Sequence, residues 1–184
     1  MFKNKVAVVT GGANGIGKCI AEEFRRNGAA VCIIDKAEGD HFVGDISIKS
    51  VLETFAQQVI AQHGHIDFLV NNALPLMKGI DECSYEEFQY ALAVGVTAPF
   101  YLSKLFAPHF NKGGSIINIS SSRDRMSQPQ TTCLDIEGTS VPSIAFMPHF
   151  SRFDSSFLRT YNIFRPADKY CRQFLPYDGL ISYQ

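Results

Sequence analysis

A glycine-rich turn near the N-terminus constrains this chain more than any other feature. The apolar run Val6–Val9 is followed by Thr10 and then by glycines at positions 11, 12, 15 and 17, after which apolar residues recur at helical spacing. This pattern is typical of a buried strand that turns tightly into a helix. Such a turn directs unpaired backbone N–H groups at a ligand, usually a phosphate. We expect Gly11 to adopt a positive φ, Gly15 to admit a diphosphate and Gly17 to allow close helix–strand packing.

Strand-like and helix-like segments alternate from Lys5 to about Ser122. Strands are predicted near residues 5–9, 30–34, 42–44, 66–70 and 115–119, and helices near 15–27, 47–63 and 84–110. Mostly apolar strands in this alternation predict an α/β fold, a Rossmann-like, doubly wound parallel sheet with strand order 3-2-1-4-5. A ligand of such a sheet lies beyond the carboxyl ends of the strands. The glycine turn, Asp35, Asp45, residues 71–73 and residues 120–122 all fall at those ends.

Several helix ends carry recognisable signals. Ser47 or Ser50 is expected to cap the second helix, with Ser50 and Glu53 spaced as a capping box, and Gly64 is expected to end it. Ser84 and Glu87 have the same capping-box spacing before the third helix. A Gly113-Gly114 pair is expected to end the following helical stretch.

Composition narrows the class of protein. With 184 residues, 46% of them hydrophobic, the chain can bury one core, and a net charge of −1 argues against nucleic-acid or anionic-membrane partners. No apolar run is expected to span a membrane, and no signal peptide is recognised. The five cysteines lack CxxC or metal-like spacing, which predicts free thiols, a cytoplasmic location and no metal site.

The pattern changes near Pro129, beyond which prolines and aromatic residues are frequent and helical periodicity is not sustained. We therefore predict a dinucleotide-binding domain over residues 1–130 and an irregular tail over residues 131–184. Within the tail, Asp154–Phe164 and Asp168–Leu175 are candidates for short helices.

Over about residues 4–130 the chain resembles the short-chain dehydrogenase/reductase (SDR) family of NAD(P)-dependent oxidoreductases. Thr10–Gly17 matches its TGxxxGIG coenzyme loop, Asp35 its ribose-binding acid, Asp45-Ile46 the pair beside the adenine, and Asn71–Ala73 the NNAG element, in which Leu74 replaces the glycine. The resemblance implies coenzyme binding by Thr10, Gly11, Asn14, Gly15, Ile16, Gly17, Asp35, Asp45, Ile46, Asn72 and Ala73. By the register of the fifth strand, Ser121 matches the catalytic serine. Asn72 has an alternative role, which is to bond neighbouring main chain.

Coenzyme choice follows from charge. A carboxylate at Asp35 accepts hydrogen bonds from ribose hydroxyls and repels a 2′-phosphate, so NAD is expected over NADP. Lys36 would offset that repulsion in part.

The proton-transfer residues of the family do not match. Its tyrosine and lysine would stand thirteen and seventeen residues after Ser121, where this chain has Leu134 and Gly138, and Gly95 stands at its asparagine position. No Tyr-x-x-x-Lys occurs in the tail. Leucine transfers no proton, so little or no activity on an alcohol or carbonyl substrate is expected.

The tail also lacks the family's long interface helix, so its homo-oligomer interface is expected to be lost, and no asparagine-containing sixth strand is recognised. Either the tail has diverged, or the sequence from about residue 131 is a reading-frame or assembly artefact that makes the dehydrogenase truncated; the abrupt loss of the match favours the second. The predicted function is NAD-dependent oxidoreduction. The alternatives are a non-catalytic NAD-binding or scaffold protein and a frameshifted, inactive product.

Overall fold

The computed structural model describes residues 1–75, 78–79, 81–121 and 158–165. Its strands are β1 Val6–Thr10, β2 Ala30–Asp35, β3 Phe42–Val43, β4 Ile66–Asn71, β5 Phe110–Ser121 and β6 Leu158–Arg165. Its helices are α1 Gly15–Arg26, α2 Lys49–His63, α3 Tyr85–Leu92 and α4 Ala98–Phe106, with a π-helical turn Ala93–Thr97 between α3 and α4 and a 3-10 turn Ala107–His109 after α4. All described strands pair in parallel.

The sheet has the order β3-β2-β1-β4-β5-β6, which confirms the predicted 3-2-1-4-5 core and adds a strand. Strand β6 pairs with β5 from Gly114 opposite Leu158 to Ser121 opposite Arg165, with Asn118 opposite Asn162. The prediction of a short helix over Asp154–Phe164 is therefore wrong at residues 158–164, as is the prediction that the tail has no asparagine-containing strand. The edge of β5 supplies unpaired backbone groups that favour an added strand over an isolated short helix. Other tail residues lie outside the described part.

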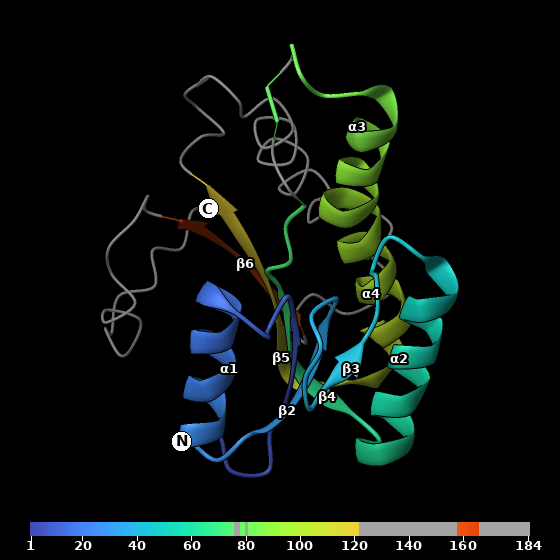
Figure 1. The fold of residues 1–184 in the computed structure, drawn as a ribbon. Helices are drawn as coiled ribbons and strands as arrows, with labels where there is room; N and C mark the ends of the chain where they lie inside the picture. Colours follow the sequence, from blue (N-terminus) through green and yellow to red (C-terminus); the bar gives the residue numbers. More distant parts are fainter. Residues whose placement is uncertain (76–77, 80, 122–157, 166–184) are drawn as a thin grey trace.

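Helices cover both faces of the sheet, with α1 on one side and α2 and α4 on the other (Figure 1). The α1 side is closed by an aromatic cluster of Phe2, Phe24 and Phe68, whose ring centroids lie 5.1–5.3 Å apart. On the other side Phe55 of α2 and Phe106 of α4 are fully buried against the strands. Burial of these faces holds the strand ends, and thus the loops that follow them, in fixed positions.

The helix-end predictions have mixed outcomes. Ser84 and Glu87 form the expected capping box, and Gly64 ends α2 with a φ of +76°. The predicted caps at Ser47 or Ser50 are wrong, because α2 begins after Ile48 and has no side-chain cap. The Ser47 N–H instead donates to Asp45 Oδ1 over 2.9 Å. Gly113 and Gly114 do not end a helix but lie inside β5, where Gly113 has a φ of +80° and the pairing register with β4 is irregular.

One helical stretch, Tyr85–His109, is long and apolar enough to cross a membrane by length and composition alone, with a mean hydropathy of 1.3. The expectation that no segment reaches that length is therefore corrected. Val94, Ala98, Leu102 and Phe106 on this stretch are buried in the core cluster shared with the sheet, which is the arrangement of a core helix.

Among the cysteines of the described part, Cys32 and Cys83 are thiols, whereas Cys19 is disulfide-bonded. The prediction that all five are free is therefore wrong at Cys19.

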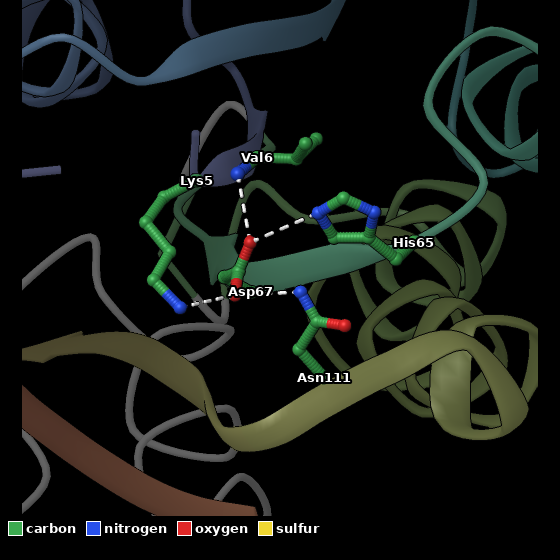
Figure 2. Close-up of polar contacts among 5 residues, drawn as sticks. All are labelled: Lys5, Val6, His65, Asp67 and Asn111. Carbon is green, nitrogen blue, oxygen red and sulfur yellow. Dashed lines mark hydrogen bonds and ion pairs between the residues drawn. The ribbon is translucent and has the colours of Figure 1, made fainter. Parts of the chain in front are cut away.

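A buried aspartate organises the amino end of the sheet (Figure 2). Asp67 on β4 is only 2% exposed. Its Oδ1 accepts from Lys5 Nζ at 2.9 Å and Asn111 Nδ2 at 3.1 Å, and its Oδ2 accepts from the Val6 N–H at 2.9 Å. The Nε2 atom of His65 lies 3.5 Å from Oδ2. One carboxylate thus joins the starts of β1, β4 and β5.

Candidate functional site

A cavity of about 760 Å³ opens at the carboxyl ends of β1, β2, β3 and β4. Its lining includes most of the residues that the sequence predicts for coenzyme binding: Gly11, Asn14, Gly15, Ile16, Asp35, Asp45, Ile46, Asn72 and Ala73. The two remaining predicted residues, Thr10 and Gly17, are buried and do not line the cavity. Because the sheet is parallel, segments that are far apart in the chain meet at one edge, as Thr10 and Ala73 do across 63 positions.

The glycine turn has the expected backbone. Gly11 has a φ of +65° and Gly15 a φ of +54°, and a Cβ placed on Gly15 would meet no atom within 4 Å, so this position is open. Gly17 is buried, and a Cβ there would clash with the Gly11 carbonyl oxygen and Asn72 Nδ2. At the start of α1, the Asn14 side chain makes no cap hydrogen bond. The first N–H groups of α1 are therefore presented without a side-chain acceptor from the cap, as an anion site requires.

Buried hydrogen bonds join the turn to the end of β4. The Asn72 and Ala73 N–H groups donate to Thr10 Oγ1 at 3.0 and 3.1 Å, so the Thr10 hydroxyl positions the loop from behind the cavity. The Asn72 Nδ2 atom donates to the carbonyl oxygens of Thr10 and Gly11 at 3.1 and 3.0 Å. Two roles were expected for Asn72, which are binding the coenzyme and bonding neighbouring main chain. Its side-chain amide nitrogen has the second role.

Asp35 lies at the end of β2 with its carboxylate at the cavity wall. Its Oδ2 accepts from the Ala13 N–H at 2.9 Å, and its Oδ1 accepts from the Ala37 N–H at 3.0 Å. Each oxygen has further acceptor capacity, because a carboxylate offers about four lone-pair sites. Asp35 can therefore stabilise the glycine turn and still accept hydrogen bonds from a ligand.

Asp45 follows β3 and is linked to α3. Its Oδ1 accepts from the Ser47 N–H, and its Oδ2 accepts from the Tyr90 hydroxyl at 3.0 Å. Burial raises the pKa of Asp45, but the hydrogen bonds from Ser47 and Tyr90 and the charge of Lys36 outweigh it, so the pKa lies below its ordinary value. Asp45 therefore stays ionised at neutral pH.

Sequence reasoning missed the wall that α3 contributes. Glu86, Glu87 and Tyr90 of α3 line the cavity together with Val94 of the π-helical turn. The segment between β4 and α3 adds Leu74, Pro75, Lys78 and Cys83. The signal was present, because positions 86, 87, 90 and 94 recur at helical spacing and share one face of a helix. Among the described residues, no group of three His, Cys, Asp or Glu side chains is placed to hold a metal ion.

The predicted catalytic positions are described only in part. Ser121 is the last residue of β5, and Gly95, at the asparagine position, is buried in the π-helical turn. Leu134 and Gly138 lie outside the described residues.

Comparison with known proteins assigns the family. A family model described as short chain dehydrogenase matches residues 5–133. The chain therefore belongs to the short-chain dehydrogenase family, and its resemblance over residues 4–130 is confirmed.

The matched relatives are longer than this chain. L-fucose dehydrogenase of Mus musculus is 36% identical over 144 residues, which cover 70% of this chain and 53% of that protein. A short-chain dehydrogenase/reductase from Serratia marcescens has a TM-score of 0.80 at 25% identity, covering 89% of this chain and 74% of that one. The chain thus spans about half the length of the curated relatives it matches.

Solved structures with the same fold include complexes with both nicotinamide coenzymes. A Burkholderia cenocepacia short chain dehydrogenase in complex with NADP has a TM-score of 0.71 at 24% identity, over 77% of this chain and 66% of that one. A Brucella melitensis 3-ketoacyl-(acyl-carrier-protein) reductase complexed with NADH has a TM-score of 0.76 at 23% identity, over 88% and 75%. At these identities the likeness concerns the fold alone.

Proposed function

We propose that this chain binds NAD in the cavity at the carboxyl end of the sheet. The observation that carries the proposal is that one cavity joins the uncapped start of α1, the Asp35 carboxylate and the Asp45-Ile46 pair. Parallel strands lie about 4.8 Å apart, so a ligand reaching from the end of β3 to the end of β4 crosses three strand spacings, roughly 14 Å. An elongated molecule with a central diphosphate suits this shape and these donors.

Each part of the wall has a role in the proposal. The N–H groups at the start of α1, beside Asn14, Gly15 and Ile16, hold the diphosphate. Asp35 accepts hydrogen bonds from the ribose hydroxyls of the adenosine, and Asp45 and Ile46 border the adenine. The negative charge of Asp35 favours a ribose hydroxyl over a 2′-phosphate, and therefore NAD over NADP.

The chemistry that NAD supplies when bound is hydride exchange with an alcohol or carbonyl carbon. Ser121 is the proposed residue for orienting a carbonyl oxygen. With Leu134 and Gly138 at the positions of the family's proton donor and its lysine, no group there gives or takes a proton. We therefore propose binding of NAD with little or no turnover, in a cytoplasmic location.

Calorimetric titration of the full chain with NAD tests the binding. Ile16→Glu places a negative charge at the start of α1 within the cavity, and we expect it to lower NAD affinity by about tenfold or more. Gln57→Glu adds the same charge at an exposed position of α2 and should leave the affinity unchanged. A wild-type chain that folds but does not saturate with NAD would overturn the proposal.

A dehydrogenase and reductase assay over a panel of alcohols and ketones tests the turnover. We expect no NADH-linked rate above that of the buffer. Substantial turnover by the purified chain would show that another residue supplies the proton, and Tyr161→Phe and Tyr170→Phe would then identify it.

A further inference from the structure

The side chain of Lys36 lines the cavity beside Asp35, where a 2′-phosphate of NADP would need a positive partner. Its ammonium nevertheless has other partners. Lys36 Nζ donates to the Tyr90 hydroxyl at 3.1 Å, lies 3.9 Å from Asp45 Oδ2 and stands 5.2 Å from the centroid of the Tyr90 ring. The lysine is therefore directed to α3 and to the segment after β3.

Tyr90 connects these partners. Its hydroxyl accepts the hydrogen bond from Lys36 and donates one to Asp45 Oδ2 at 3.0 Å, so a single oxygen joins the cation to the carboxylate. The three residues come from the end of β2, the segment after β3 and helix α3, and all three line the cavity. The hydrogen bond to Tyr90 raises the pKa of Lys36, which keeps the ammonium charged at neutral pH.

We propose that Tyr90 is a specificity-determining residue for the coenzyme: by holding the Lys36 ammonium against Asp45, it withholds the positive charge that a 2′-phosphate requires. This inference rests on the proposed function, namely that the cavity takes a nicotinamide dinucleotide. It adds to that function a physical cause for the preference between the two dinucleotides.

The cause is a competition for one cation. A 2′-phosphate carries between one and two negative charges near neutral pH and would lie close to the carboxylate of Asp35. To bind it, Lys36 has to leave the Tyr90 hydroxyl, the Tyr90 ring and Asp45 together. A 2′-hydroxyl needs only the Asp35 oxygens and leaves this arrangement intact.

The test measures the Kd of NAD and of NADP by calorimetry at one ionic strength, and compares their ratio between variants of the full chain. Tyr90→Phe keeps the ring and removes the hydroxyl, and we expect it to lower the ratio of the NADP Kd to the NAD Kd by about threefold to tenfold. Tyr85→Phe is the matched control, because Tyr85 lies on the same helix, is 72% exposed and contacts Gln89 instead.

Lys36→Met separates this mechanism from a change of cavity shape. Alone it should not lower the ratio, because the wild-type lysine is already engaged. Combined with Tyr90→Phe it should abolish the gain in NADP binding, since the released cation is then missing. Asp45→Asn provides a second route to the same release if Tyr90→Phe does not fold, and Lys36→Met should abolish its gain as well.

Three results would overturn the inference. In the first, the ratio of the NADP Kd to the NAD Kd stays unchanged in both Tyr90→Phe and Asp45→Asn. In the second, Tyr85→Phe lowers this ratio as much as Tyr90→Phe does. In the third, the ratio stays lowered in the double variants that lack Lys36. Each of these three results can be measured only if the wild type binds NAD, so none of them contradicts the proposed function. A folded wild type that binds neither dinucleotide overturns the proposed function itself, and the selectivity proposal with it.

Discussion

The two ends of the sheet each have an aspartate that accepts backbone N–H groups, yet the two carboxylates are suited to different tasks. Asp67 at the amino end is 2% exposed and has contacts from four side chains or backbone groups (Figure 2). Asp35 at the carboxyl end accepts one N–H group on each oxygen and borders a cavity. Both residues are aspartates, so residue type does not separate their tasks. A carboxylate suited to a ligand still has acceptor sites that face a cavity, whereas a structural carboxylate is buried among its protein partners.

The largest effect should come from Asp67→Ala. It leaves the Val6 N–H and Asn111 amide without their acceptor and Lys5 without its partner, so we expect the free energy of unfolding to fall by about 3 kcal/mol. Urea denaturation measures it, with the exposed Asp40→Ala as the control. A loss as small as that of the control would mean that the carboxylate does not join these strands.

Asp35→Ala should separate binding from stability. We expect NAD affinity to fall by about tenfold, because hydrogen bonds from a ligand to a charged group are lost, while the free energy of unfolding changes by no more than about 1 kcal/mol. Calorimetry and urea denaturation of the same preparation give both values. A large loss of stability with unchanged affinity would reverse the roles assigned to the two aspartates.

The pH dependence of stability should also depend on Asp67. Burial raises its pKa, but the hydrogen bonds from Lys5, the Val6 N–H and Asn111 outweigh burial and hold the pKa below its ordinary value. A lowered folded-state pKa stabilises the protein fully above the unfolded-state pKa of about 3.9, and this contribution is lost as the pH falls through the folded-state pKa. Urea denaturation from pH 6 to pH 3 should therefore show a steeper loss for the wild type than for Asp67→Asn. Parallel curves would contradict this.

The smallest effect concerns thiol reactivity inside and outside the cavity. Burial raises the pKa of Cys32 to about 11, with a smaller opposite effect from Arg25, so at pH 8 only about one thiol in a thousand is ionised. Cys83 lines the cavity. We expect iodoacetamide to modify Cys83 before Cys32, and NAD to slow the modification of Cys83 a few-fold. Mass spectrometry identifies the modified residue. Equal rates of Cys83 modification with and without NAD would mean that bound NAD does not cover Cys83.

Much of the fold was predictable because it depends on local pattern. Buried parallel strands are continuous apolar runs, the glycine turn has few alternatives, and the Ser84 and Glu87 spacing marks a helix start. Predictions failed where a contact with another residue or strand decided the outcome. Ser47 donates its N–H to Asp45 and does not cap α2, and β6 pairs with β5. The helix–strand ambiguity of a short segment is resolved by what it pairs with.

The sequence by itself determined the strand–turn–helix unit, the strand order and the position of Asp35, because these follow from periodicity, glycine conformation and the rules of parallel sheets. Only the tertiary structure decided that the Asn72 amide nitrogen bonds the main chain, that α3 forms a wall of the cavity, and that Lys36 is paired with Tyr90 and Asp45. The physical reason is distance along the chain. Lys36 and Tyr90 are 54 positions apart, and only the packing of α3 over the sheet edge brings a hydroxyl to the ammonium.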